Sequence, residues 1–93
     1  MIKKVKASHI LVKTEEEAEE ILHLVADGKD FKEVAREKSQ CPSKEKGGSL
    51  GWFKKGQMVP EFEQACFLGS KGELIGPIKT QFGWHVIKIE DTK

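Results

Sequence analysis

The sequence lacks any long apolar run. No stretch of its 93 residues approaches the roughly 18 to 20 apolar residues that a membrane-spanning helix needs. The opening residues, MIKKVKASHILVK, carry lysines within their apolar run and have no small-residue cleavage site, which argues against a signal peptide. We therefore expect no membrane partner and a cytoplasmic location.

An excess of one charge is also missing. Sixteen basic and fifteen acidic side chains give a formal net charge of +1. No global field then recruits nucleic acid, and we expect no nucleic-acid partner, although a local basic patch stays open. The lysines of the central loop are interpreted as solvated charges; they are Lys44, Lys46, Lys54 and Lys55.

Cysteine is scarce, with Cys41 and Cys66 alone and no CxxC pair. One possible disulfide is thin evidence for an oxidising compartment, so both are interpreted as reduced thiols. The scattered cysteines and histidines lack the short ligand spacings of structural zinc sites, and we predict neither a metal nor a cofactor. With no repeat or linker, residues 1–93 are predicted to form a single domain, which we expect to be a monomer.

Glycine is dense in the central stretch, CPSKEKGGSLGWFKKGQMVPEFEQACF, over residues 41–67. Glycine permits a positive φ and close approach of two backbones. Large apolar side chains, those of Leu50, Met58 and Phe62, lie between and beyond these glycines. The pattern predicts one wall of a small apolar pocket with Cys41 at its mouth. Phe82, beside a second turn, is a candidate for the same apolar surface.

Periodicity predicts strands at both ends of the chain and helices between them. The expected strands are residues 3–13, 51–53, 74–80, with Pro77 at an edge or bulge, and 84–90. The expected helices are residues 15–27, capped by Thr14, residues 31–39, and a third from Pro60 to before Gly69. This order favours an α+β domain whose terminal strands pair at the centre of one sheet.

Two histidines point with the apolar sets of the terminal strands. His9 alternates in phase with the apolar residues of the first strand and His85 with those of the last. A single inward histidine is commonly a core residue that bonds to backbone or a hydroxyl. Two such histidines, beside Ser8 and Thr80, favour a hydrogen-bonded pair of neutral imidazoles. His23 is predicted to lie on the surface and is given no role.

The thiol of Cys41 admits more than one interpretation. Nucleophilic catalysis would require His9 or His85 nearby and an orienting carboxylate or amide, and no Asp or Asn is close to either histidine in the sequence. A thiol hydrolase stays open as a minor alternative. A free cysteine also commonly serves as a small buried filler.

Three stretches together resemble the parvulin family of peptidyl-prolyl cis/trans isomerases, most closely its small single-domain members. They are SHILVK (8–13), the central stretch (41–67) and GPIKTQFGWHVIKI (76–89). The resemblance spans nearly the whole chain with matching spacings. It implies a four-stranded antiparallel sheet wrapped by about four helices, the parvulin or FKBP-like fold.

The resemblance also implies the site and the activity. The implied catalytic residues are His9, Cys41, Thr80 and His85, and the implied substrate-binding residues are Leu50, Met58, Phe62 and Phe82. The expected function is non-covalent rotation about X-Pro bonds in unfolded or folding polypeptides. The alternative is a chaperone-like module that binds proline-containing segments with little catalysis.

One departure concerns the loop after the first strand. Phosphorylation-directed parvulins carry arginines and lysines there, whereas this chain has Lys13 and Thr14 followed by three glutamates. Carboxylates would repel a phosphate, so we expect no phosphate specificity. Ser49 stands where many members have an acid, and its effect is left open.

Overall fold

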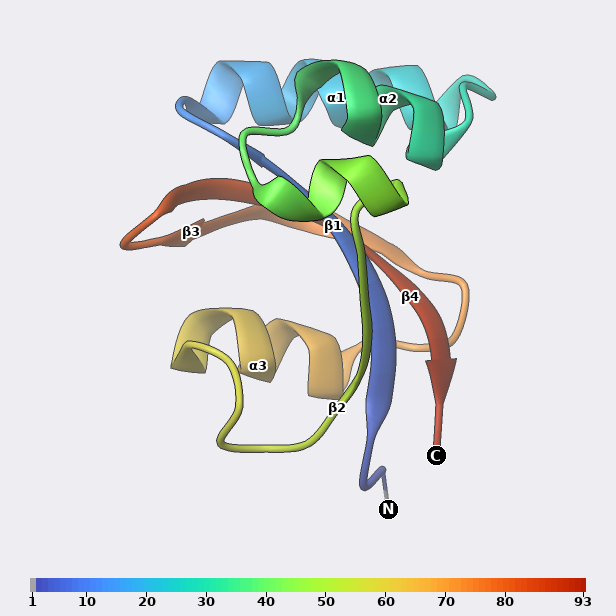
Figure 1. Cartoon of the computed structure of the whole chain (residues 1–93), viewed down its shortest axis with the longest axis vertical. Coiled ribbons are helices and arrows are strands. Elements are labelled where there is room, and N and C mark those ends of the chain that lie inside the picture. Colours follow the sequence, from blue (N-terminus) through green and yellow to red (C-terminus); the bar gives the residue numbers. More distant parts are fainter. Residues whose placement is uncertain (1) are drawn as a thin grey trace.

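The sheet is antiparallel, and its strand order is β2-β1-β4-β3. The structure is a computed structural model that describes residues 2–93 (Figure 1). The strands are β1 (Val5–Val12), β2 (Ser49–Phe53), β3 (Leu74–Thr80) and β4 (Gly83–Thr92). The first and last strands therefore form the central pair, and the predicted pairing of the terminal strands is confirmed.

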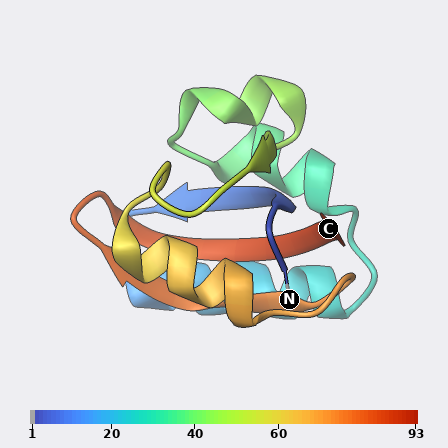
Figure 2. The ribbon, with the colours of Figure 1, turned by 90° about the horizontal axis from the view of Figure 1, so that it is seen from below.

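The helices cover both faces of the sheet. They are α1 (Glu15–Ala26), α2 (Phe31–Lys38), the short 3-10 helix η1 (Pro42–Lys46) and α3 (Pro60–Leu68). In Figure 2, α3 lies in front of the sheet and α1 lies behind it. Three α-helices and one 3-10 helix agree with the expected α+β fold, in which about four helices wrap the sheet.

The helix boundaries follow local chemistry. The hydroxyl of Thr14 accepts a hydrogen bond from the Glu17 N–H at 3.2 Å, which caps α1 as predicted. The Thr14 hydroxyl also donates a hydrogen bond to the Glu17 carboxylate at 3.1 Å, in place of the bond from the Thr14 backbone N–H that a full capping box has. Asp30 precedes α2 without a side-chain capping bond. Within residues 2–93, no helix has the length and apolarity to cross a bilayer.

Successive side chains of β1 point to opposite faces of the sheet and pack in two apolar cores. Val5 and Ala7 pack in the core beneath α3, whereas Ile10 and Val12 pack against α1 and α2. His9 is in phase with the first pair, and it lies on the α3 side together with His85. The two-residue period of the sequence therefore predicted correctly which face carries the histidines.

Strand β3 forms one edge of the sheet. Its pairing with β4 shifts register between Ile75 and Ile78, on either side of Pro77. Proline has no N–H to donate, so an edge strand and an irregular register both accommodate it. The predicted position of Pro77 is confirmed.

Candidate active site

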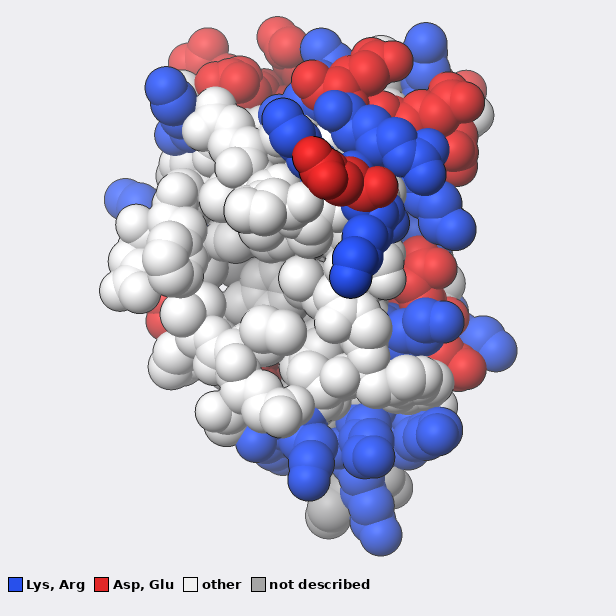
Figure 3. All heavy atoms as spheres, viewed as in Figure 1, with Lys and Arg blue, Asp and Glu red and all other residues white. Residues whose placement is uncertain are grey.

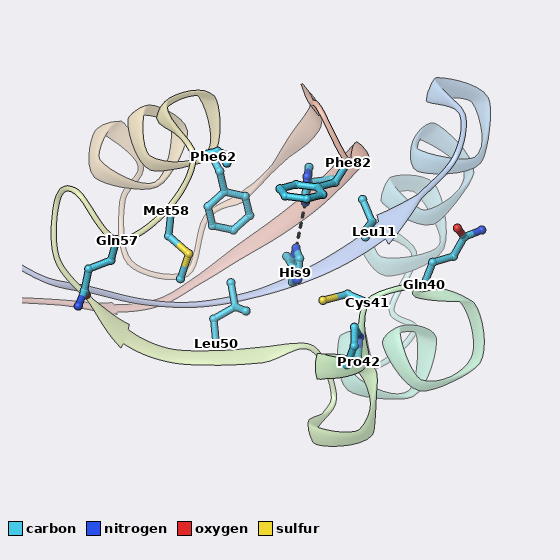
Figure 4. Close-up of a pocket in the computed structure, with 12 residues that line it drawn as sticks. His9, Leu11, Gln40, Cys41, Pro42, Leu50, Gln57, Met58, Phe62 and Phe82 are labelled. Atoms are coloured by element: carbon cyan, nitrogen blue, oxygen red, sulfur yellow. Dashed lines mark hydrogen bonds between the residues drawn. The ribbon is translucent and has the colours of Figure 1, made fainter.

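A cavity of about 500 Å³ opens on the α3 side of the sheet. In Figure 3, this part of the surface is hollowed and uncharged. Twelve residues line it, and Figure 4 shows them (His9, Leu11, Gln40, Cys41, Pro42, Leu50, Gln57, Met58, Val59, Phe62, Phe82 and His85). None of them is a lysine, arginine, aspartate or glutamate, so the cavity suits an apolar or neutral ligand.

The two buried histidines form a direct hydrogen bond. Their Nδ1 atoms are 3.0 Å apart, and their ring planes differ by 16°. They meet because β1 and β4 pair antiparallel, with His85 opposite Leu11 and His9 opposite Ile87. Two residues in this diagonal relation share one face of the sheet. The expectation that the terminal strands make His9 and His85 neighbours is confirmed.

Thr80 extends the histidine pair. Its Oγ1 lies 2.7 Å from His85 Nε2 and accepts a hydrogen bond from the Phe82 N–H at 3.2 Å. Two proton arrangements satisfy both hydrogen bonds. If His85 Nδ1 donates to His9, then His85 Nε2 accepts from the Thr80 hydroxyl; if His9 Nδ1 donates to His85, then His85 Nε2 donates to that hydroxyl. The side chain of Thr80 thus couples the β3–β4 turn to the rings. The Nε2 of His9 is buried and has no hydrogen-bond partner among residues 2–93.

Burial keeps both imidazoles neutral. Desolvation, with a smaller contribution from His85, lowers the pKa of His9 from 6.5 to about 4. Desolvation also lowers the pKa of His85. The edge-on ring of Phe62 lies against both, at centroid distances of 5.4 Å and 5.3 Å. The predicted pair of neutral, hydrogen-bonded imidazoles therefore has a physical cause in this structure.

The His9 pKa predicts a loss of stability in acid. Because the folded pKa lies below the unfolded one, the unfolded chain binds more protons between about pH 6.5 and pH 4. The free energy of unfolding is therefore expected to fall by up to about 3 kcal/mol as the pH drops through this window. Urea unfolding from pH 8 to pH 4 measures it. His9→Gln is the control, and an equal pH dependence in both proteins would contradict the prediction.

The predicted apolar residues reach the cavity from four different segments. Leu50 comes from β2, Met58 from the β2–α3 loop and Phe62 from α3 (Figure 4). Phe82 reaches the cavity from the β3–β4 turn and is 62% exposed. All eight predicted site residues thus lie in the cavity wall or, for Thr80, bond directly to it. Phe62 was expected to serve the pocket, but it is also a core residue, 3% exposed.

The two cysteines have different environments. Cys41 is partly exposed and lines the cavity near His9 (Figure 4), as expected for a thiol at the pocket mouth. Cys66 is buried in the core beneath α3, where desolvation raises its pKa to about 12. Cys66 is therefore a neutral core residue, and Cys41 is the thiol available to the cavity.

Side-chain-to-backbone contacts hold Cys41 in place. The hydroxyl of Ser39, 4% exposed, accepts hydrogen bonds from the N–H groups of Leu11 at 3.1 Å and Cys41 at 3.3 Å. The Gln40 N–H donates to the Leu11 carbonyl at 2.8 Å. These three bonds fix the Cys41 turn against β1, two residues beyond His9. Sequence reasoning missed Ser39, because nothing local distinguishes it from other serines.

Other lining residues were also missed. Leu11 shares the two-residue period of His9, and this signal could have identified it. Gln40, Gln57 and Val59 lie in loops and Pro42 begins η1, so no strand or α-helix periodicity shows which way these side chains face. No group of three or more His, Cys, Asp or Glu side chains within residues 2–93 is arranged to hold a metal ion.

Comparison with known proteins gives consistent matches. Residues 3–91 match the rotamase model described as a PPIC-type PPIase domain. The foldase protein PrsA of Geobacillus kaustophilus is 48% identical over 89 residues, which is 95% of this chain and 32% of that protein. This chain spans about a third of the length of the curated relatives that it matches.

Solved structures of other proteins resemble this chain in both fold and sequence. The crystal structure of the peptidylprolyl isomerase PrsA from Bacillus anthracis matches with a TM-score of 0.96 and 44% identity, over 99% of this chain and 43% of that one. The solution structure of NmPin, the parvulin of Nitrosopumilus maritimus, matches with a TM-score of 0.85 and 44% identity, over 94% of this chain and 95% of that one. The second match is of nearly the same length as this chain.

Proposed function

This chain belongs to the parvulin family, as a PPIC-type rotamase domain, and we propose that it accelerates X-Pro rotation without covalent chemistry. The observation that carries the proposal is the neutral His9–His85 pair at the wall of an uncharged cavity. Rotation about an amide is slow because resonance must be broken, yet no covalent bond is made or cut. An enzyme then needs only to bind the twisted amide better than either planar isomer.

The cavity supplies such binding in two parts. Leu50, Met58 and Phe62 form an apolar surface that holds the proline ring, which we call the proline-binding surface. Next to it, His9 and His85 border the prolyl amide and exclude water from its carbonyl. Loss of resonance makes the twisted amide less polar, so a dry site favours it. Each tenfold acceleration needs roughly 1.4 kcal/mol of such selective stabilisation.

We propose an electrostatic role for Cys41. Its sulfur lies at the cavity wall, where a thiol or carboxylate would shape the field around the imidazoles. We expect Cys41→Asp and Cys41→Ser to retain turnover within about tenfold, since rotation requires no acyl intermediate. An isomerisation assay with both variants checks this. Near-complete loss in Cys41→Asp would overturn the electrostatic role.

The proposed substrates are X-Pro segments without a phosphate before proline. No lysine or arginine lines the cavity, and three glutamates follow Lys13 and Thr14 at the end of β1. A phosphoserine or phosphothreonine would find no cation in the cavity wall to pair with. We also propose, as predicted from the sequence, that the chain is a single domain, monomeric and cytoplasmic.

The direct test is exchange spectroscopy on an Ala-Pro peptide. Catalysis is expected to speed cis/trans exchange at enzyme concentrations far below that of the peptide. A chaperone-like binding module would broaden the peptide peaks and leave the exchange rate unchanged. A panel of peptides varied at X, phosphoserine included, then tests specificity. Faster exchange for phosphoserine than for alanine would contradict the proposed lack of phosphate selection.

A further inference from the structure

The lower ends of β1 and β2 lie near the last residue of the chain (Figure 1), and these segments carry six lysines. Residues 2–6, 52–55 and 92–93 contain no acid. The Lys93 N–H donates to the Lys4 carbonyl at 2.9 Å, and Lys6 lies opposite Trp52. Figure 3 shows this end covered by basic side chains. The lysine cluster comprises Lys3, Lys4, Lys6, Lys54, Lys55 and Lys93.

The lysine cluster carries an excess of positive charge, although Asp91 lies opposite Lys6 on β4. Within residues 2–93 the salt bridge is between Lys71 and Asp91, at 3.6 Å, and none involves the cluster. The Glu63 carboxylate, beside the β2–α3 loop, instead accepts a hydrogen bond from the Gly56 N–H. The ammonium group of Lys93 lies 4.7 Å from the Trp52 ring centroid. Unpaired like charges repel one another, so an anion bound here would relieve that repulsion.

The cluster adjoins the cavity at one end. The Gln57 side chain lines the cavity and accepts a hydrogen bond from the Lys54 N–H at 2.8 Å. In Figure 4, Gln57 and Met58 lie on one side of His9, and Leu11 lies on the other. If the proline ring lies against Met58 and residue X lies toward Leu11, the chain that follows proline leaves past Gln57. It then runs toward Lys54 and Lys55.

We propose that the lysine cluster binds an acidic polypeptide segment that follows the proline of a bound substrate. This inference rests on the proposed isomerase function and on the position of the proline ring. A polypeptide fits better than nucleic acid or a bilayer, because Lys54 bonds to Gln57 in the wall of the cavity that is proposed to bind a polypeptide. Exposed charges attract over about one Debye length, so the preference is sensitive to salt.

The test compares four peptides by exchange spectroscopy at low and high salt. They share an Ala-Pro core, with four glutamates after proline, four glutamines after it, four lysines after it, or four glutamates before alanine. At low salt, kcat/KM for glutamate after proline is expected to exceed that for glutamine about fivefold. Lysine after proline should lower it, glutamate before alanine should give no gain, and about 0.5 M salt should remove the gain.

The variants separate this inference from the proposed function. Lys54→Gln/Lys55→Gln is expected to bring the glutamate-to-glutamine ratio close to one, while the exposed control pair Lys29→Gln/Lys38→Gln keeps the gain. If no peptide is accelerated, the proposed function fails. If all are accelerated equally, or the gain survives in Lys54→Gln/Lys55→Gln, this inference alone fails. Cluster-dependent binding of single-stranded DNA or anionic vesicles without any peptide preference would also overturn it.

Discussion

The double substitution Met58→Ala/Phe62→Ala is expected to lower kcat/KM for X-Pro rotation about 10²- to 10³-fold. Each side chain contributes apolar contact worth about 1.5 to 3 kcal/mol when it is fully buried against a ligand. Even partial loss of both contacts removes about 3 to 4 kcal/mol of transition-state binding, and each 1.4 kcal/mol is a factor of about ten. Exchange spectroscopy on the Ala-Pro peptide measures the loss.

Phe62 complicates this experiment because it also supports the fold. Its ring contacts both imidazoles and the Phe53 ring, and a buried Phe→Ala change costs about 3 to 5 kcal/mol of stability. Thermal unfolding must therefore accompany the rate. Met58→Ala alone separates the effects, since Met58 is only partly buried. It is expected to lower kcat/KM about tenfold with little loss of stability.

Leu68→Ala is the matched control for Met58→Ala. Leu68 ends α3, is 79% exposed and is not among the residues that line the cavity. It should therefore change neither the rate nor the unfolding temperature beyond a small amount. Unchanged turnover in Met58→Ala would mean that the proline-binding surface lies elsewhere in the cavity.

Periodicity predicted what depends on regular secondary structure. Alternation placed His9 with the α3-side residues of β1 and His85 with those of β4, because side chains on a strand alternate between faces. The order of elements then favoured a central pair of terminal strands, and this pairing brings the rings together. Their catalytic roles stay predictions, which the resemblance implied and the geometry supports.

Loop geometry was predicted less completely. The glycine density of the central stretch indicated positive φ and close approach, and Gly47, Gly48, Gly51 and Gly56 all have positive φ. Which glycine meets which backbone depends on contacts between residues far apart in the sequence. The bond from the Leu11 N–H to the Ser39 hydroxyl spans 28 positions, and the bond from the His9 N–H to the Gly48 carbonyl joins residues still farther apart in the sequence. No local pattern encodes such pairs.

Gly48→Ala is expected to destabilise the fold by about 3 kcal/mol or more and to reduce activity with it. The Gly48 carbonyl accepts the His9 N–H at 2.9 Å, and a Cβ on Gly48 would lie 2.4 Å from the His9 carbonyl oxygen. That oxygen belongs to the backbone of a central strand, so it cannot move without displacing His9. A misplacement of about 1 Å at a catalytic group can cost about 10²-fold in rate.

Gly51→Ala is the matched control, because it makes the same change three residues farther along, within β2, at another glycine with positive φ. Gly51 has φ +70° against +87° at Gly48, yet a Cβ there would meet no atom within 4 Å. Only left-handed strain of about 1 to 2 kcal/mol remains. Urea unfolding and exchange spectroscopy on both variants therefore isolate the contact with His9. Equal losses in the two variants would show that strain alone requires glycine here, and that the residue before β2 does not position His9 through close backbone approach.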